Sequence, residues 1–256
     1  MRVALIAIAK CEELYIEEWL NHHLDIGFDT IIVADNDDTP ILSKFASDRV
    51  IIEDYCGVDG VQPKAYSELF KKYRSDFDWI FFCDIDEFVV IEDGSDVKTF
   101  LSSFDADMVR LNCKHFTDND ELDVIDGDYR VMERFKTPIA VTQDRFFKTF
   151  INCRIALEEP TIYGHGIYNK TLKAVDAEGH MCPTNKMGVK ALHKVAWVNH
   201  YRTKTIGEYM RQKCFRGGAN KNPKRYSEWK AYFRATNTLT DEKIAYAEKI
   251  IEESRP

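Results

Sequence analysis

The 256-residue sequence has no long apolar run, and no segment approaches the roughly 18 apolar residues that a membrane-spanning helix needs. The apolar opening of the chain, residues 3–9, is too short for the core of a signal peptide and ends abruptly in charged residues. We therefore expect a cytoplasmic protein. A peripheral contact with the inner face of a membrane stays open at this point.

Cysteine and glycine motifs are also missing. The seven cysteines are scattered, odd in number and never spaced as Cys-X-X-Cys, which argues against a disulfide framework or a zinc site and fits reduced thiols. No Gly-X-Gly-X-X-Gly turn is present, which counts against dinucleotide-dependent hydride transfer. A Gly-rich phosphate loop is absent as well, which weakens a nucleotidyltransferase or phosphohydrolase interpretation.

Positive charge is in deficit, with 35 Lys and Arg against 43 Asp and Glu and a formal net charge of -8. This balance argues against a general nucleic-acid-binding protein, because phosphate contacts need a basic face. One section differs: residues 201–230 hold nine Lys or Arg and only two Glu. We expect this section beside an anion, and a solvated basic helix or a contact with anionic lipid head groups are the alternatives.

Apolar periodicity predicts a regular alternation of strands and helices in the first hundred or so residues. The predicted strands are 3–9, 30–34, 50–52, 79–83 and 108–112, with a late strand at 191–198. The predicted helices run from Glu12 to Gly27, over 63–73 and from a cap at Ser95 to Leu101. This order predicts an α/β fold with a parallel sheet wound in the Rossmann manner. Residues 114–128 are polar and predict a mobile loop, and the pattern beyond Thr205 is helical. We expect a catalytic domain over 1–205 and a helical extension over 206–256.

The stretch Trp79–Phe88 carries the strongest functional signal. Its apolar strand runs into Asp84, Asp86 and Glu87, which places three acids at the carboxyl end of a buried strand, where open α/β sheets hold their ligands. Asp84 and Asp86 are two apart, so their side chains point the same way if the strand continues, and they can also converge in a turn. Such a pair predicts Mn²⁺ or Mg²⁺ bound with a diphosphate, and the alternative is a pair of solvated turn residues.

Several short motifs occur in a characteristic order: Lys10-Cys11-Glu12-Glu13, Tyr15-Ile16-Glu17-Glu18-Trp19, Asp35-Asn36, Gln62, Asp84-Ile85-Asp86-Glu87-Phe88, Glu133-Arg134-Phe135 and His200-Tyr201-Arg202-Thr203-Lys204-Thr205. In this order the chain resembles glycosyltransferase family 92 and its bacterial relatives in the family 2 superfamily, from residue 1 to about residue 220. The resemblance implies the GT-A fold, a nucleotide-sugar donor and usually Mn²⁺ or Mg²⁺. One position departs from the family: its first motif more often reads Lys-Asn-Glu, and here Cys11 replaces the Asn.

The resemblance also implies roles for the metal ligands. Asp86 would bind the ion directly, and Asp84 would reach the ribose or, through water, the metal. GT-A enzymes commonly supply one more ligand late in the chain, and His200 follows the apolar residues 195–198 that would carry it there. His165, between two glycines, competes for this role, and a histidine bonded within the core is the alternative for either one.

The nucleotide is expected at the ends of the first two strands, with Asp35 accepting a hydrogen bond from a pyrimidine imide N–H, which favours uridine. The predicted nucleotide-binding residues are Ala7, Lys10, Glu12, Asp35, Gln62, Lys64, Asp84 and Lys204. Arg211, Lys213 and Arg216 would add positive charge near the diphosphate, with Gly217 and Gly218 allowing that segment to bend. The alternative for Glu12 is an ordinary acidic residue in the first turn of a helix. The alternative for Gln62 is a residue that only starts the helix.

Inversion at the anomeric carbon, which the resemblance implies, requires a carboxylate that takes the acceptor proton. The candidate bases are Asp118, Asp120, Glu158 and Glu159. A single sequence gives no reason to prefer one of them. The sequence thus predicts a metal-dependent glycosyltransferase, of the hexosyltransferase class, that moves a sugar from a UDP-sugar to a glycan or lipid-linked acceptor in polysaccharide biosynthesis. The alternatives are a nucleotidyltransferase or phosphohydrolase and a catalytically silent nucleotide-sugar-binding module.

Overall fold

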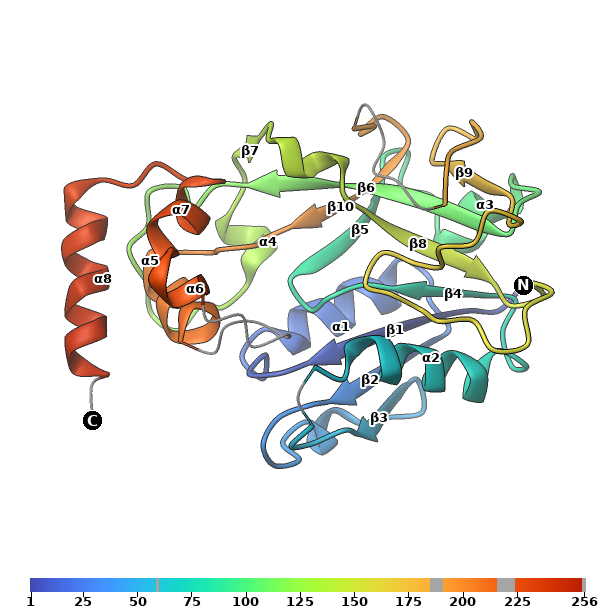
Figure 1. Cartoon of the computed structure of the whole chain (residues 1–256), viewed down its shortest axis with the longest axis horizontal. Coiled ribbons are helices and arrows are strands. Elements are labelled where there is room, and N and C mark those ends of the chain that lie inside the picture. The colour runs from blue at the N-terminus through green and yellow to red at the C-terminus, as the bar shows by residue number, and fades with distance from the viewer. Residues whose placement is uncertain (59, 185–190, 216–223, 255–256) are drawn as a thin grey trace. The chain divides into compact units, whose positions relative to one another are not determined.

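A computed structural model describes residues 1–58, 60–184, 191–215 and 224–254 (Figure 1). The chain divides into two compact units. The first unit comprises Met1–Lys114 and Thr142–Asn199, and the second comprises His115–Val141 and His200–Pro256. The chain therefore passes from one unit to the other three times.

The first unit is organised around a mixed sheet. Its strands are β1 (Val3–Ala9), β2 (Thr30–Asp35), β3 (Val50–Asp54), β4 (Trp79–Phe82), β5 (Glu87–Ile91), β6 (Met108–Phe116), β8 (Phe147–Asn152), β9 (Ala174–Asp176) and β10 (Ala196–His200). The strand order is β3-β2-β1-β4-β8-β6-β10-β5, and β9 pairs with β6. β1 to β4 are parallel, whereas β8 runs antiparallel to both β4 and β6. The predicted α/β class, with a mostly parallel sheet flanked by helices, is confirmed.

Helices cover both faces of this sheet. The main helices of the first unit are α1 (Ile16–Asp25), α2 (Gln62–Tyr73) and α3 (Val97–Ser102). Tyr66 of α2 packs on Phe82, with ring centroids 5.1 Å apart, whereas Phe81 packs on Phe28, which follows α1, at 6.2 Å. Successive strand residues point to opposite faces, so α1 and α2 lie on opposite sides of the sheet (Figure 1). All seven residues of β1 are buried, as expected for a strand covered on both sides.

The second unit is mainly helical. It contains α4 (Val131–Arg134), β7 (Pro138–Ile139), α5 (Ile206–Glu208), a π-helical turn (Tyr209–Cys214), α6 (Lys224–Ser227), α7 (Trp229–Arg234) and α8 (Asp241–Glu253). Its core packs apolar residues from four of the helical segments, including Ile206, Met210, Phe233 and Ile250. Where the sequence predicts a boundary between 205 and 206, this unit begins at His200 and also takes residues 115–141. Among the described residues, no helix is long and apolar enough to cross a membrane.

The polar segment that the sequence predicts to be a mobile loop is instead anchored. Lys243 of α8 lies 2.7 Å from Asp118 and 2.9 Å from Asp120, measured from Nζ to carboxylate oxygen. Asp123 pairs with Arg211 and accepts a hydrogen bond from Tyr246 Oη at 2.6 Å. These contacts join residues about 90 to 120 positions apart, and local polarity gives no sign of such pairing.

Two predicted element ends also shift. The cap of α3 is Asp96, not Ser95, because the Asp96 side chain accepts the Thr99 N–H at 2.7 Å. The late strand begins at Ala196 instead of 191.

Candidate functional site

Polar residues collect at the carboxyl edge of the parallel strands in the first unit. Ala9 pairs with Asp35, and Ile6 pairs with Phe82, so the residues that follow β1, β2 and β4 emerge at one edge. After β4 the chain turns, and the Glu87 N–H donates to the Asp84 carbonyl at 3.1 Å. Of the two geometries that the sequence leaves open for Asp84 and Asp86, the structure has the turn.

Asp84 is held in place by two donors. Gln62 Nε2, at the start of α2, lies 2.8 Å from Oδ1, and Lys148 Nζ lies 2.7 Å from Oδ2. Lys148 reaches Asp84 because its neighbour in β8, Thr149, pairs with Phe82 at the end of β4. The Asp84 side chain remains 37% exposed, and each oxygen has a second lone pair. The carboxylate is therefore oriented and still accessible.

Lys148 is buried, with 2% of its side chain exposed, and joins two acids. Its Nζ lies 2.8 Å from Glu87 Oε2, which also accepts the Asp84 N–H at 2.9 Å. Burial acts to lower the pKa of Lys148, but the charges of Asp84 and Glu87 outweigh it and hold that pKa well above its ordinary value. Burial raises the pKa of Glu87 to about 8, and Asp84 and Asp86 add to this effect while Lys148 opposes it. The turn thus concentrates acidic groups, and Asp86 is 6% exposed.

His165 lies beside this cluster on a tight hairpin in which Tyr163 and Gly166 exchange backbone hydrogen bonds of 3.0 and 2.9 Å. Its Nδ1 is 2.9 Å from the Phe147 carbonyl, which can only accept, so Nδ1 carries the hydrogen and Nε2 presents a lone pair in the neutral ring. Burial, aided by the charge of Lys148, lowers the pKa of His165 and favours this neutral form. A neutral imidazole whose other nitrogen donates to a carbonyl is the arrangement of a metal-ligating histidine.

The ends of β1 and β2 hold a second polar group, which involves Asp35 and Asp37. Asp35 uses its oxygens on the backbone N–H groups of Asp37, Ile41 and Leu42, at 3.2, 3.0 and 2.9 Å, so it shapes the loop after β2. Asp37 accepts the Cys11 N–H with Oδ1 at 2.9 Å. Its Oδ2 is buried and has no hydrogen-bond partner within the described part of the chain. Burial raises the pKa of Asp37, the Cys11 N–H opposes this, and an unsatisfied buried oxygen favours a ligand that donates.

The other predicted nucleotide-binding residues of the first unit differ in where they lie and in how far they are exposed. Lys10 lies at the edge, with Nζ 3.1 Å from Asp38. Glu12 is 6% exposed, and its carbonyl accepts the first N–H groups of α1. Lys64 lies on the exposed side of α2, and Ala7 is fully buried within β1. The structure therefore brings Lys10 and Glu12 to the carboxyl edge, exposes Lys64 in the first turn of α2 and buries Ala7 within β1.

The two candidate bases of the first unit, Glu158 and Glu159, do not lie at Asp84. Glu158 is exposed, and Glu159 lies 2.5 Å from Lys71 near the carboxyl end of α2. Gln62, at the other end of this helix, is nine residues away, or about 14 Å along the axis. Asp118, in the second unit, is 2% exposed and held by Lys243. The structure thus separates Glu158 and Glu159 from the acid cluster and buries Asp118 in an ion pair.

The remaining predicted residues belong to the second unit. The ring of His200 packs on that of His115, with centroids 4.8 Å apart. Lys204 is buried with a φ of 55° and lies 3.4 Å from Gln212 Oε1. Lys213 donates to the Arg202 carbonyl at 2.8 Å, and Arg211 pairs with Asp123. Arg216, Gly217 and Gly218 lie outside the described residues.

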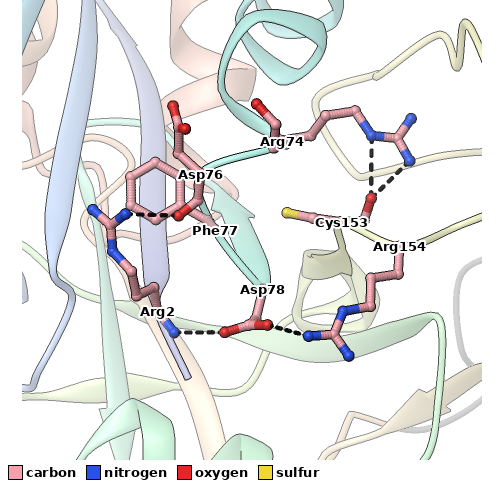
Figure 2. A pocket seen from close by; sticks show the side chains of 8 residues that line it. Arg2, Arg74, Asp76, Phe77, Asp78, Cys153 and Arg154 are labelled. Atoms are coloured by element: carbon pink, nitrogen blue, oxygen red, sulfur yellow. Dashed lines mark hydrogen bonds and ion pairs between the residues drawn. The ribbon is translucent and has the colours of Figure 1, made fainter.

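A cavity of about 530 Å³ lies at the opposite, amino edge of the sheet, next to the residues that precede β4 and follow β8 (Figure 2). It is lined by Arg2, Arg74, Ser75, Asp76, Phe77, Asp78, Cys153 and Arg154. Arg74 donates four hydrogen bonds of 2.7–3.1 Å to the carbonyls of Cys153, Ile155 and Leu157. Asp78 lies between the Arg2 N–H and Arg154, as Figure 2 shows. These charged groups hold the segment that follows β8. The cavity lies at the edge of the sheet opposite to Asp84, so it is not the candidate active site.

No family model matches the chain, and no curated protein matches it. Similar solved structures include those of S. aureus TarS. A structure of its residues 1–349 is 15% identical, with 60% of this chain and 47% of that chain covered and a TM-score of 0.39. The same fragment in complex with UDP-GlcNAc is 18% identical, with 49% and 37% covered and a TM-score of 0.36. Another TarS structure is 12% identical, with 84% and 39% covered and a TM-score of 0.43. This chain spans less than half of each of these TarS chains.

Proposed function

We propose that this protein is a metal-dependent glycosyltransferase that moves a sugar from a UDP-sugar to a glycan or lipid-linked acceptor, with inversion, in polysaccharide biosynthesis. One observation carries the proposal: the carboxylate of Asp84 is fixed by Gln62 and Lys148 beside Asp86, at the carboxyl edge of parallel strands. Open α/β sheets bind their ligands at this edge. The order of motifs that resembles family 92 supports the same chemistry.

The proposed ligands are of the types that a hard divalent cation takes. Asp84 and Asp86 offer carboxylate oxygens, and His165 offers a neutral imidazole nitrogen, a donor set that suits Mn²⁺ and also admits Mg²⁺. We propose that Asp84 and Asp86 would hold the ion, with His200 of the second unit, or His165 as the alternative, as the further ligand. The bound ion would supply positive charge to the leaving diphosphate.

The chain's own residues perform the remaining tasks. Lys148 and Gln62 fix the Asp84 side chain, so little reorganisation is needed when the donor binds. Asp37 Oδ2 accepts from the imide N–H of uracil, which satisfies an otherwise unpaired buried oxygen. Cytosine presents a lone pair at the equivalent ring nitrogen, so the site should prefer UDP to CDP.

A binding experiment tests this proposal. Thermal unfolding with UDP, CDP or GDP, with and without Mn²⁺, should show the largest shift for UDP with Mn²⁺. A ligand at 100 times its dissociation constant adds about 2.7 kcal/mol of apparent stability. Asp86→Ala should abolish the metal-dependent part of the shift, whereas Asp105→Ala, at an exposed acid that pairs with Lys173, should leave it intact. Equal shifts with and without Mn²⁺ would contradict the metal role.

Turnover separates the alternatives. UDP release from a UDP-sugar, present in the wild type and absent in Asp86→Ala, is expected for a glycosyltransferase. Pyrophosphate release from a nucleoside triphosphate would indicate a nucleotidyltransferase instead. Tight UDP binding without any turnover would indicate a silent binding module.

A further inference from the structure

Two exposed tyrosines flank the hairpin that carries His165. Tyr163 is 41% exposed and Tyr168 is 45% exposed, and their rings stack with centroids 4.9 Å apart and planes at 18°. Large aromatic side chains are costly to leave in water, and tyrosines that offer a ring face and a hydroxyl are typical of binding surfaces. Below, these two residues are called the tyrosine pair.

The tyrosine pair borders the acid cluster within the first unit. A Cβ on Gly164, the residue after Tyr163, would lie 3.6 Å from Gln62 Oε1, and Gln62 donates to Asp84 at 2.8 Å. The His165 carbonyl accepts the Thr149 hydroxyl at 2.7 Å, one residue from Lys148. The hairpin therefore contacts both residues that hold Asp84, or their direct neighbours.

The tyrosine pair stands on a rigid support. Ile162 and Ile167, one residue from Tyr163 and Tyr168 respectively, are buried in the core beneath α2. Gly166 has a φ of 118°, and any Cβ there would lie 2.9 Å from Thr149 Oγ1, so the hairpin is pressed against β8. Exposed rings on a fixed backbone lose little conformational entropy when a ligand packs on them.

The strand order places the tyrosine pair on the side of Asp84 away from the nucleotide. Across the sheet the order is β2, β1, β4, β8. Asp37, the candidate contact for the base, follows β2; Asp84 follows β4; and the hairpin contacts Thr149 in β8. A nucleotide that begins at Asp37 and ends with its diphosphate at Asp84 leaves the β8 side for the second substrate.

We propose that the tyrosine pair is the acceptor subsite and binds a neutral saccharide, whose ring packs its apolar C–H face on a tyrosine while its hydroxyls bond the phenolic oxygens. This inference rests on the proposed function and names the acceptor class: a glycan recognised by its sugar ring instead of by charge. The sugar ring next to the tyrosines would present its hydroxyl toward Asp84, where the donor sugar is attached to the diphosphate.

The experiment uses the full chain with cellotriose and chitotriose as probes, and saturation-transfer NMR as the binding readout. Wild type should bind at least one of the two trisaccharides. Tyr163→Leu/Tyr168→Leu should weaken that binding by tenfold or more, about 1.4 kcal/mol, while the thermal shift with UDP and Mn²⁺ stays unchanged. Tyr168→Phe, which keeps the ring, should retain most of the affinity. Tyr226→Ala, at a tyrosine of the second unit that is 43% exposed, is the matched control and should change neither readout.

Each outcome of these binding measurements either supports or overturns the assignment of the tyrosine pair as the acceptor subsite. Wild-type affinity in the double leucine variant, or no binding of either trisaccharide by the wild type, would overturn the inference even if UDP-sugar turnover is found. Loss of the UDP shift in that variant would assign the rings to the donor and overturn it too. Tyrosine-dependent saccharide binding without any UDP binding would support the subsite and refute the proposed function, so the two ideas fail separately.

Discussion

Replacing Arg134 with methionine should lower the free energy of unfolding of the second unit by roughly 3–5 kcal/mol, because it removes the guanidinium that bonds both oxygens of a buried acid. The Arg134 guanidinium donates to both oxygens of Glu208, at 3.0 and 2.9 Å, and twice to Glu121 Oε2, at 3.2 and 3.0 Å. The side chain of Glu208 is 2% exposed and that of Arg134 is 8% exposed. Water therefore cannot replace the guanidinium in the variant without opening the structure.

Urea unfolding of the wild type, Arg134→Met, Glu208→Gln and the double variant gives the measurement. The double variant should recover much of the loss, because a neutral amide costs far less to bury than a carboxylate that has lost its guanidinium partner. Arg130→Met removes an exposed arginine that pairs with Asp128 in the same segment, and it should cost under about 1 kcal/mol. A loss for Arg134→Met no larger than that of Arg130→Met, or a double variant as weak as the single one, would refute the reasoning.

The pH dependence adds a check of sign. Burial acts to raise the pKa of Glu208, but Arg134 and Thr205 outweigh it and hold that pKa below its ordinary value. The folded state then binds fewer protons than the unfolded state as the pH falls below about 4.5, so this stabilisation is present above that pH and is lost in acid. The difference in the free energy of unfolding between the wild type and Arg134→Met should become smaller toward pH 3.5. A difference that does not change with pH would show that the ionisation of Glu208 is not the cause of the lost stability.

Three further predictions concern the first unit. Burial holds the pKa of His23 well below its ordinary value, and its ring bonds the Trp19 carbonyl and the Val89 N–H. Only the unfolded chain then takes up a proton below about pH 6.5, so thermal stability should fall in acid for the wild type and change less with pH in His23→Gln. Cys11→Asn should raise the free energy of unfolding in urea by up to about 1 kcal/mol, because Cys11 has a φ of 57°, which asparagine tolerates better; a decrease would contradict this. Gly166→Ala should lower the free energy of unfolding by about 1–3 kcal/mol, more than Gly94→Ala, because Gly94 also has a positive φ, of 72°, but has open space around it.

The parallel half of the fold could be predicted from sequence because its signals are local. The apolar runs at Val3–Ala9 and Trp79–Phe82 are buried on both faces, and acids follow the strands where the chain leaves the sheet. The same locality identified Asp84 and the turn alternative for it. Cys11 shows that a local departure can also be understood: it takes the left-handed conformation, with a φ of 57°, that an asparagine accommodates more readily.

The partners of the site could not be predicted in this way. Lys148 lies in β8, Phe147–Asn152, and its contact with Asp84 spans 64 residues, so from sequence a lysine followed by a threonine indicates a solvent-facing position. Asp35 and Asp37 are two apart and chemically alike, and only the path of the loop after β2 decides that Asp35 serves the backbone while Asp37 keeps an unpaired oxygen. Pairing across long sequence separations leaves no periodic signature.

The interleaved path of the chain has a consequence for biosynthesis and for shortening the protein. Residues 115–141 leave the ribosome long before α8, so Asp118 and Asp123 have no partner in Lys243 and Tyr246 until α8 has been made. Ending the polypeptide at residue 205, before the expected helical extension, would remove the apolar core of the second unit and leave Asp118 and Asp123 without Lys243, Arg211 and Tyr246. Such a shortened chain should therefore aggregate, not yield an independent catalytic half.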